Sequence, residues 1–272
     1  LVRDKLQSVA AAATEAVILA SDDQNCLLIA AKQEEAKRVS WFGAPYASSA
    51  EIRGLGFANT FSERLDTPAP NTSVLSLVGQ SAQFNVAGRE TTVSLPNRGL
   101  HYALDAAAAL ESSRRLLANF SPDKAAEVLS GLPPVFARGE VAEVRGQKIE
   151  FILVQNPASF QLNLDNLVVH PECLMIAIGR DVHDPSWLWT VDFSKIRSVQ
   201  MITGYNAAEM ALRLGYEAIF ADQTTDDLEL GIENFLALPG PATGMKTIIF
   251  SADAMRRTRR YLGLTNPEEV AR

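Results

Sequence analysis

The first half of the chain mixes two patterns of apolar and polar residues. Short apolar runs predict buried strands, and segments that alternate apolar with polar residues predict antiparallel strands. Strands are expected at 15–20, 38–42, 74–79, 82–88 and 90–96. Helical patterns fall at 4–13, 26–36 and 98–118, and Ser121-Pro122-Asp123 begins a further helix that ends near Gly131. Ala87-Gly88 is the expected hairpin turn between the last two strands.

The second half is more regular and predicts an α/β domain. Its apolar runs fall at 149–154, 173–179, 198–204, 217–221 and 246–251. Helical patterns lie between most of them, as at 206–215 and 226–238. Strands that alternate with helices predict a parallel, doubly wound sheet with helices on both faces. Ligands of such sheets bind beyond the carboxyl ends of the strands. Those ends carry Gln155-Asn156-Pro157, Gly179-Arg180-Asp181, Thr203-Gly204 and Asp222.

Two domains are expected, over residues 1–133 and 134–272. Pro133-Pro134 breaks the chain between the two patterns. Residues 44–72 are rich in Gly, Pro, Ser, Asn and Thr and predict an irregular segment within the first domain.

Composition narrows the classes of function. Of the 272 residues, 47% are hydrophobic and 21% charged, which is ordinary for a globular protein. The net charge is −7 and the pI about 5.1, so the chain is a poor candidate for binding nucleic-acid phosphates. No apolar run approaches the length that spans a bilayer, and a cytoplasmic location is expected. Cys26 and Cys173 lie far apart in apolar runs and predict free thiols.

Common catalytic motifs are missing or incomplete. Residues 240–247, GPATGMKT, resemble a phosphate-binding loop, but the glycine spacing is short and a strand rather than a helix follows. We interpret them as a loop that leads into a strand. The segment 134–144 contains Arg138 and Glu140. Two interpretations are open: the two residues form a solvated charge pair in a linker, or Arg138 clamps a phosphate at a cleft between the domains.

The segment 181–193, DVHDPSWLWTVDF, is the strongest candidate for a functional loop. It holds Trp187 and Trp189 among several acids. Packing would explain the tryptophans but does not require the acids beside them at the end of a strand. Asn156-Pro157 likewise stands where a site is expected, although a simple turn explains it equally well.

Seven segments, in order, resemble the MurT-type branch of the Mur ligase family. They are LVRDKL (1–6), ILASDD (18–23), RVSWFG (38–43), LPNRGLHYALDAAAAL (95–110), FARGE (136–140), QNPASFQ (155–161) and DPSWLWTVDF (184–193). The helix GYNAAEMALRLGYE (204–217) also resembles the family. The resemblance implies part of a Mur ligase central domain at 1–133, with its P-loop half missing, followed by a Rossmann-like C-terminal domain with a mostly parallel sheet.

The resemblance also implies a reaction. MurT-type proteins amidate the α-carboxylate of the D-glutamate in the stem peptide of lipid II. ATP and Mg²⁺ convert the carboxylate to an acyl phosphate, and ammonia from a GatD-type glutaminase subunit displaces the phosphate. The lipid-linked substrate would bring this cytoplasmic protein to the inner membrane surface.

Residue roles follow only from the resemblance. Asp184 matches the essential aspartate of the family's Ser-Trp segment. Arg138 matches the hinge arginine near the nucleotide, and Asn156 matches the motif asparagine. These three residues are expected to face one cleft. Asp22 and Asp23 match acids at a strand end whose role can be structural.

The chain departs from the family pattern at several points. No cysteines stand in 44–72 where the family has a zinc ribbon, so no zinc is expected. Gln155 replaces the lysine before the asparagine-proline motif, and Thr190 replaces the aspartate after the second tryptophan. An alternative function is therefore a non-catalytic Mur-fold module that docks a glutaminase-like partner. A weaker alternative is a relative of folylpolyglutamate synthase, against which the SWLW segment argues.

Overall fold

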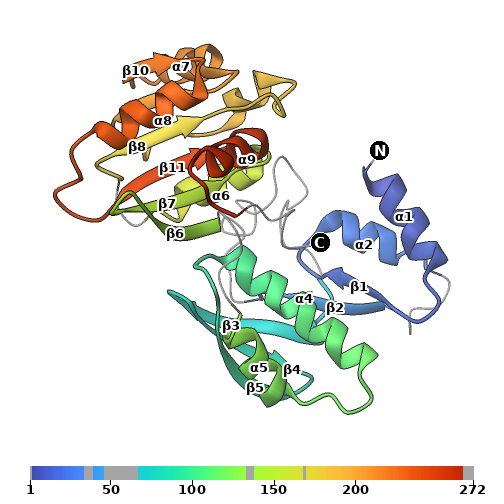
Figure 1. Ribbon diagram of the computed structural model, residues 1–272. Helices are drawn as coiled ribbons and strands as arrows, with labels where there is room; N and C mark the ends of the chain where they lie inside the picture. The colour runs from blue at the N-terminus through green and yellow to red at the C-terminus, as the bar shows by residue number, and fades with distance from the viewer. Residues whose placement is uncertain (1, 34–38, 46–66, 133–137, 168–169, 266–272) are drawn as a thin grey trace. The chain divides into compact units, whose positions relative to one another are not determined.

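The computed structural model describes residues 2–33, 39–45, 67–132, 138–167 and 170–265. The chain forms two compact units, Leu1–Pro133 and Pro134–Arg272, shown in Figure 1. Each unit has its own hydrophobic core. No described helix is long and apolar enough to cross a membrane.

The first unit contains a five-stranded mixed sheet. The strands, in their order across the sheet, are β1 (Val17–Ala20), β2 (Val39–Gly43), β3 (Thr72–Val78), β4 (Ser81–Val86) and β5 (Arg89–Ser94). β1, β2 and β3 run parallel, and β3, β4 and β5 run antiparallel. The predicted strands and the hairpin are confirmed. Ala87 and Gly88 both have positive φ, and the Asn85 side chain accepts a 2.8 Å hydrogen bond from the Gly88 amide.

Four described helices cover this sheet. They are α1 (Val2–Ala12), α2 (Gln24–Ala30), α4 (Leu100–Leu116) and α5 (Pro122–Ser130). α4 buries Ala103, Ala107 and Leu110 against the sheet, and the small alanines allow a close approach of helix and strands. α5 starts as predicted, with Ser121 as N-cap and Pro122 at the first position. α2 ends at Ala30, before the end expected from the pattern at 26–36.

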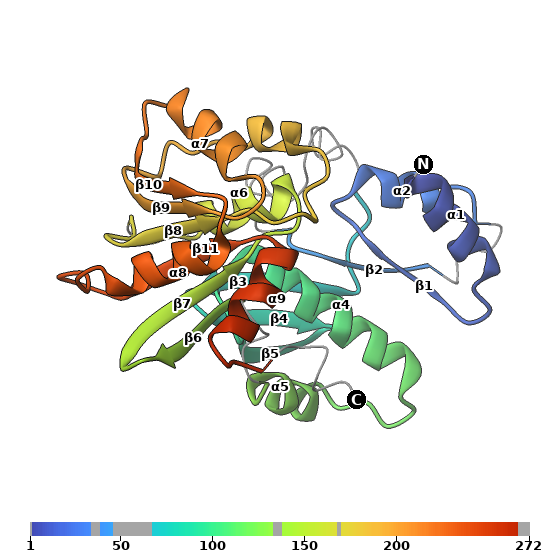
Figure 2. The same ribbon diagram turned by 45° about the horizontal axis from the view of Figure 1, so that its top comes forward.

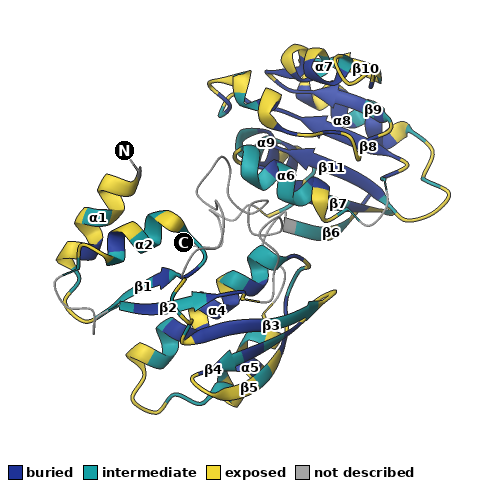
Figure 3. Cartoon of the chain, turned by 180° about the vertical axis from the view of Figure 1, so that it is seen from behind, coloured by how far each residue is buried: buried dark blue, intermediate teal, exposed yellow. Residues whose placement is uncertain are grey.

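The second unit is a six-stranded sheet with helices on both faces, as predicted. The strands are β6 (Arg138–Val144), β7 (Gln147–Leu153), β8 (Leu174–Ala177), β9 (Val199–Thr203), β10 (Ala221–Thr225) and β11 (Lys246–Phe250). Their order is β10-β9-β8-β11-β7-β6, and all pairs are parallel except β6 with β7. The strands β8, β9 and β11, which the pattern predicted as apolar runs, are the most buried part of this unit (Figure 3).

The helices of the second unit divide into two layers, which Figure 2 shows on either side of the sheet. α6 (Pro157–Asp165), the 3₁₀ helix η2 (Pro185–Thr190) and α7 (Ala207–Gly215) share one core with the sheet. α8 (Leu228–Ala237) and α9 (Ala252–Tyr261) share the other. The α/β fold class with a mostly parallel second sheet is therefore confirmed.

Two sequence interpretations of this unit are wrong. The segment 138–144 is not a linker but the antiparallel edge strand β6, joined to β7 by a turn at Arg145-Gly146. Only one side of this strand packs on the core, so it lacks the continuous apolar run that marked the other strands. β10 lies four residues later than the run at 217–221, because Ile219 packs into the core before pairing with β9 begins at Ala221.

Candidate functional site

The topology of the second unit singles out one edge of its sheet. β11 lies between β7 and β8. The segments that follow β7 and β8 pack on one face, whereas α9, which follows β11, packs on the other. At the carboxyl ends of these strands, the chain therefore turns toward one face of the sheet after β7 and β8 and toward the opposite face after β11. Such a switch point is where open α/β sheets bind their ligands.

The loops at this edge are held tightly together. The buried Asn206 side chain donates 2.9 Å hydrogen bonds to the carbonyl oxygens of Gly179 and Val182, so it joins the loop after β9 to the loop after β8. Asn206 stands at the start of α7, as predicted, but its side chain makes no capping hydrogen bond there. Gly204 packs so closely on the Ile178 carbonyl that a Cβ would lie 2.6 Å from that oxygen. The result is a rigid platform.

A second set of hydrogen bonds joins β8 to β11. The Asp181 carboxylate accepts from the Ser251 hydroxyl at 2.6 Å and from the Ala252 amide at 2.9 Å. Ser251 Oγ accepts from the Gly179 amide, and Asp253 accepts from the Arg180 amide at 3.1 Å. These polar groups satisfy one another, so Asp181 acts in this structure as a tie between loops.

Asp184 caps the 3₁₀ helix of the predicted functional loop. Its Oδ1 accepts a 3.0 Å hydrogen bond from the Ser186 amide, and Pro185 occupies the first helical position. The carboxylate is exposed. Hydrogen bonds from Ser186 lower the pKa of Asp184 below its ordinary value, so the group is negatively charged at neutral pH. Asp184 thus caps η2, and its negative charge is exposed to solvent.

Asn156 caps α6 in the same manner. Its side chain accepts a 2.8 Å hydrogen bond from the Ser159 amide. The Ser159 hydroxyl accepts in return from the amides of Asn156, at 3.1 Å, and of Gln155, at 2.8 Å. This reciprocal capping box explains the Asn-Pro pair physically, because asparagine suits the cap and proline the first helical position.

The elements that these two residues begin pack against each other. Phe160 of α6 meets Trp187 edge to face at 6.2 Å and Phe193 at 5.2 Å between ring centroids. The Gln161 side chain accepts a 2.8 Å hydrogen bond from the Asp192 amide. No hydrogen bond joins Asn156 to Asp184 directly within the described residues. The structure therefore couples the two predicted site residues through the bodies of their helices.

Arg213 anchors the same loop from the other side. Its guanidinium is buried and donates hydrogen bonds to the carbonyls of Leu188, at 3.2 Å, and Val191, at 2.8 Å. It also pairs with Glu217 at 2.8 Å. The sequence pattern gives Arg213 no special role, because an arginine in an amphipathic helix normally faces solvent. A buried arginine is one signal that a neighbouring segment must be held in one conformation.

One exposed pair lies on this edge of the sheet. The Arg180 guanidinium stands 5.4 Å from the centre of the Tyr205 ring, and both side chains are exposed. The guanidinium makes no ion pair with a described residue. The sequence analysis placed Arg180 at a strand end but assigned it no task. It is an available cation at the position where the fold predicts a ligand.

Arg138 begins β6, and its side chain lies outside the described part of the structure. The nearby Glu140 is partly buried on the same strand. Its carboxylate accepts a 2.7 Å hydrogen bond from the buried Arg259 guanidinium of α9. The pattern at 136–140 therefore includes one residue with a clear structural task.

The segment that most resembles a phosphate-binding loop does not fit the phosphates of a nucleotide. The loop before β11 is a connection to that strand, as predicted. Lys246 is buried, and its ammonium donates to the carbonyls of Phe235, Leu236 and Leu238 at 3.0, 2.9 and 2.7 Å. It therefore closes the end of α8 and cannot reach a phosphate. Among the described residues no three potential ligands gather to hold a metal ion. Most of 44–72, where the family has its ribbon, lies outside them.

Both cysteines are free thiols, and their surroundings do not activate them. Burial and the nearby Asp23 raise the pKa of Cys26 to about 11. Burial likewise raises the pKa of Cys173. Neither thiol is ionised at neutral pH, which argues against a nucleophilic role.

The acids at the end of β1 have local structural partners. Asp23 caps α2 by accepting a 2.8 Å hydrogen bond from the Asn25 amide. Asp22 accepts from the Ala44 amide at 2.8 Å. Gly43 passes so close to Ser21 and Asp22 that no larger residue fits without a shift.

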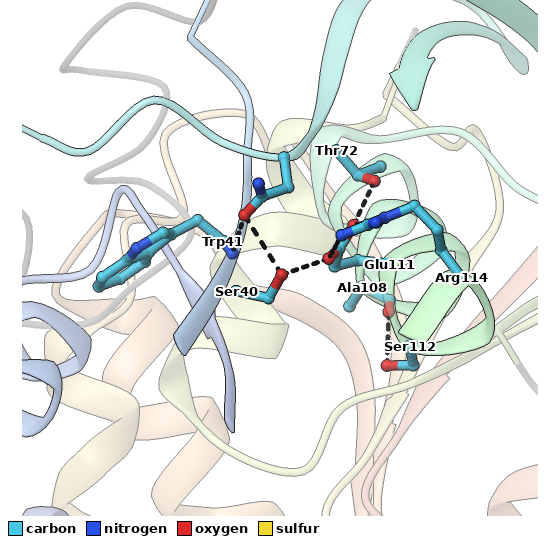
Figure 4. Close-up of polar contacts among 8 residues, drawn as sticks. Ser40, Trp41, Thr72, Ala108, Glu111, Ser112 and Arg114 are labelled. Carbon is cyan, nitrogen blue, oxygen red and sulfur yellow. Dashed lines mark hydrogen bonds and ion pairs between the residues drawn. The ribbon is translucent and has the colours of Figure 1, made fainter. Parts of the chain in front are cut away.

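A buried carboxylate in the first unit, Glu111, is the centre of a polar network (Figure 4). It accepts hydrogen bonds from the hydroxyls of Ser40 and Thr72 and from the Arg114 guanidinium at 2.6 and 2.9 Å. The Ser40 hydroxyl also bonds to Asn71. Every group has a partner within the unit, so this network fastens α4 to β2 and β3 rather than forming an open site.

Comparison with known proteins supports the fold of the second unit. Residues 153–247 match the model of a family described as MurT ligase C-terminal. This match contains the DPSWLW segment and Asp184. The second unit is thus similar to the C-terminal domains of Mur ligases, in agreement with the resemblance seen in its sequence. No curated protein sequence matches the chain.

Several solved structures share the fold of nearly the whole chain. A pseudomurein peptide ligase type C from Methanothermus fervidus is 14% identical, with a TM-score of 0.71, over 96% of this chain and 59% of that one. MurF ligase from Thermotoga maritima, solved with ADP, is 16% identical, with a TM-score of 0.63, over 98% and 57%. Folylpolyglutamate synthase from the same organism is 16% identical, with a TM-score of 0.55, over 91% and 54%. This chain thus spans a little more than half the length of these ligases.

Proposed function

We propose that this chain takes part in ATP-dependent amidation of the D-glutamate α-carboxylate in the stem peptide of lipid II, with ammonia from a GatD-type glutaminase partner. The observation that carries the proposal is the match of residues 153–247 to the MurT ligase C-terminal family. The DPSWLW segment within it is held in one conformation by α6 and α7. A loop fixed in this way suits a reaction that needs a charge at a set position.

Asp184 is the residue to which we assign the chemistry. Its carboxylate is ionised, exposed and fixed at the start of η2. A fixed negative charge can bind an ammonium ion or orient ammonia by hydrogen bonds. Arg180 follows β8 and Asn156 follows β7 at the carboxyl edge of the sheet, and they offer a cation and an amide toward the anionic substrate. Arg138 keeps its proposed place near the nucleotide on the resemblance alone.

ATP and Mg²⁺ enter the proposal from the family, since MurF ligase from Thermotoga maritima was solved with ADP. The described residues of this chain offer no loop that fits the phosphates. The proposal therefore requires residues outside those described to bind the nucleotide, and we assign no described residue to it.

The test is an assay of the complete gene product, co-expressed with the partner glutaminase. We expect amidation of lipid II that requires both glutamine and ATP, with mass spectrometry detecting a loss of about one mass unit per amidated carboxyl. A soluble nucleotide-linked precursor, assayed in parallel, distinguishes the substrate. Absence of amidation for both substrates, from a preparation that still binds the glutaminase, would contradict the proposal.

That last outcome would favour the alternative function, a non-catalytic Mur-fold module that docks the glutaminase. An exposed apolar face on the second unit favours this alternative. Tyr216 and Phe220 are 73% and 76% exposed. Leu212, four residues before Tyr216, is also exposed, and so is Trp189, whose ring contacts that of Tyr216. Exposed aromatic residues are typical of protein interfaces.

The surroundings of this face are acidic. Residues 205–230 contain six acidic residues and one basic residue, the buried Arg213. A partner with a basic rim would complement it, whereas a second copy would bring like charges together. Phe220→Asp should weaken glutaminase binding at least tenfold in calorimetry, and Val141→Asp, an exposed apolar position on β6, should not. Equal affinities of the two variants would exclude this face as the docking site.

A further inference from the structure

A pocket lies between α4 and α5 in the first unit, away from every residue discussed above as a candidate site. Its volume is about 330 Å³, which is within the range of small-molecule sites. Leu110 forms its buried side, Phe120 is half-buried, and Leu117 and Val128 flank the opening with 59% of each side chain exposed. The walls are therefore mainly aliphatic.

The apolar character continues outside the pocket. Leu116, beside Leu117 in the chain, is 74% exposed, and Leu132, one turn beyond Val128, is also exposed. These four residues form what we name the leucine rim: Leu116, Leu117, Val128 and Leu132. Leu117 and Val128 line the pocket, and Leu116 and Leu132 are close to them in the chain. Single exposed apolar residues are ordinary, but four of them close in the chain to one apolar pocket are typical of a binding surface.

The pocket lining carries a positive charge, because Lys124 is the one charged residue among those that line it. Arg115 is exposed beside Leu116 in the chain. The acids of α5 do not line the pocket: Asp123 is paired with Arg89, and Glu127 stands outside the lining. An apolar pocket with cations at its mouth fits a hydrocarbon chain that carries an anionic head group.

The walls are held in place before any ligand binds. Ser121 caps α5, and the Ser130 hydroxyl at its other end accepts a 2.9 Å hydrogen bond from the Ser94 amide of β5. The end of α4 is closed by a 2.9 Å hydrogen bond from the Leu117 amide to the Ser113 carbonyl. A preformed pocket loses little conformational entropy on binding.

The composition favours a lipid over a protein partner. Protein interfaces are rich in exposed aromatic residues and poor in lysine. The leucine rim has aliphatic residues, and lysine and arginine accompany it. Helices that lie at a membrane surface combine these same residue types.

We propose that the α4–α5 pocket and its leucine rim bind the hydrocarbon chain of an anionic membrane lipid, with Lys124 next to the head group. The chain would enter between Leu117 and Val128, and the rest of the leucine rim would contact the lipid surface. This proposal is independent of the proposed amidation, because it concerns other residues and another unit.

The experiment is flotation of the full 272-residue chain with vesicles of phosphatidylcholine, with and without about 30% phosphatidylglycerol. We expect binding to the anionic vesicles. The double variant Leu117→Asp and Val128→Asp should weaken it at least tenfold, and Lys124→Glu severalfold, since both remove a stated contact. Val78→Asp is the matched control, because Val78 is 78% exposed in the same unit and does not line the pocket. All changed positions are exposed, and thermal melts verify folding.

A second measurement reports whether a lipid chain enters the pocket. Leu117→Trp should show a blue-shifted emission with anionic vesicles and quenching by lipids brominated along the chain. Either no vesicle binding, or binding that salt abolishes and the double variant leaves unchanged, would overturn the proposal. A Leu117→Trp spectrum that does not shift would do the same. Self-association that the double variant removes would show that a second copy covers the leucine rim, and would also overturn it.

Discussion

The Arg213 guanidinium lies over the Trp189 ring, with its central carbon 5.6 Å from the ring centre. It also stands 5.2 Å from the centre of the Phe193 ring. This cation connects α7 to residues 188–193, which include the end of the DPSWLW segment, through two aromatic faces and two backbone carbonyls. The arginine thus adds contacts from α7 to the hydrogen bonds of the 3₁₀ helix itself in fixing the conformation of this segment.

Replacement of Arg213 by lysine should destabilise the second unit by about 2 kcal/mol, because lysine cannot donate to both carbonyls while lying flat on the rings. Urea unfolding measures the loss. Trp189 should become more mobile, which a red shift in tryptophan emission would reveal. Arg197→Lys, at an exposed arginine in the same unit, is the control and should change neither quantity. An unchanged emission in Arg213→Lys would contradict the anchoring role.

Asn206→Ala should lower stability by about 2 kcal/mol, since it leaves the carbonyls of Gly179 and Val182 without their buried donor. Asn206→Asp should be worse, because a carboxylate would face the same two oxygens. Asn234→Ala, at a surface residue that bonds to Gln223, is the matched control. Equal melting temperatures for Asn206→Ala and the control would show that the loops after β8 and β9 do not depend on this residue.

The periodic patterns predicted most of the fold because burial dictated them. β7, β8, β9 and β11 are buried on both faces and appear in the sequence as continuous apolar runs. β6 was not predicted as a strand, and β10 was predicted four residues too early, because both are edge strands with polar, exposed positions. The pattern of apolar and polar residues reflects which side chains are buried. An edge strand is defined by its backbone hydrogen bonds to one neighbour, which need no apolar run.

The sequence predicted only those residues of the candidate site whose role depends on their near neighbours in the chain. Asn156 and Asp184 stood out, and each begins a helix at the expected edge of the sheet. Arg213 did not stand out, and Asn206 did so only as the first residue of a helix, because their tasks are hydrogen bonds to carbonyls 22 to 27 residues away in the chain. Such partners depend on the crossover topology, which the sequence leaves open.

The Glu111 network predicts a pH dependence for the first unit. Burial alone would raise the pKa of Glu111, but hydrogen bonds from Arg114, Ser40 and Thr72 outweigh burial and lower it. A carboxyl whose pKa is lower in the folded state adds stability above its unfolded pKa, near 4.5. That contribution is lost as the pH falls from about 4.5 toward the folded value. Unfolding of the first unit in urea, followed between pH 7 and 3, should show this loss.

Glu111→Gln should remove this part of the pH dependence and cost about 3 kcal/mol at pH 7, because it leaves Arg114 without its buried partner. Glu127→Gln, at an exposed acid of α5, is the control and should leave the pH profile unchanged. The same loss of stability between pH 7 and 3 in the wild-type chain and in Glu111→Gln would show that other groups cause it.

Lys246→Met should cost about 3 kcal/mol in the second unit, because methionine fills the volume but leaves three carbonyls at the end of α8 without a donor. The exposed Lys148→Met is the control for the loss of one charge. Chemical denaturation compares the two. If Lys246→Met is as stable as Lys148→Met, the ammonium is not needed to close α8.

Asp184→Asn separates the charge of this residue from its structural task. Asparagine caps helices about as well as aspartate, so the variant should keep η2 and lose less than about 0.5 kcal/mol. Under the proposed amidation, the loss of the charge should lower kcat at least a hundredfold with little change in KM for lipid II. Asp192→Asn is a close control, because Asp192 accepts a 2.8 Å hydrogen bond from the Ser194 amide in the same loop, and hydrogen bonds from Ser194 lower its pKa as well. It should keep near-normal activity. Equal activities of the two variants would show that the loop needs these carboxylates only for its shape, and the assignment of Asp184 to the chemistry would fall.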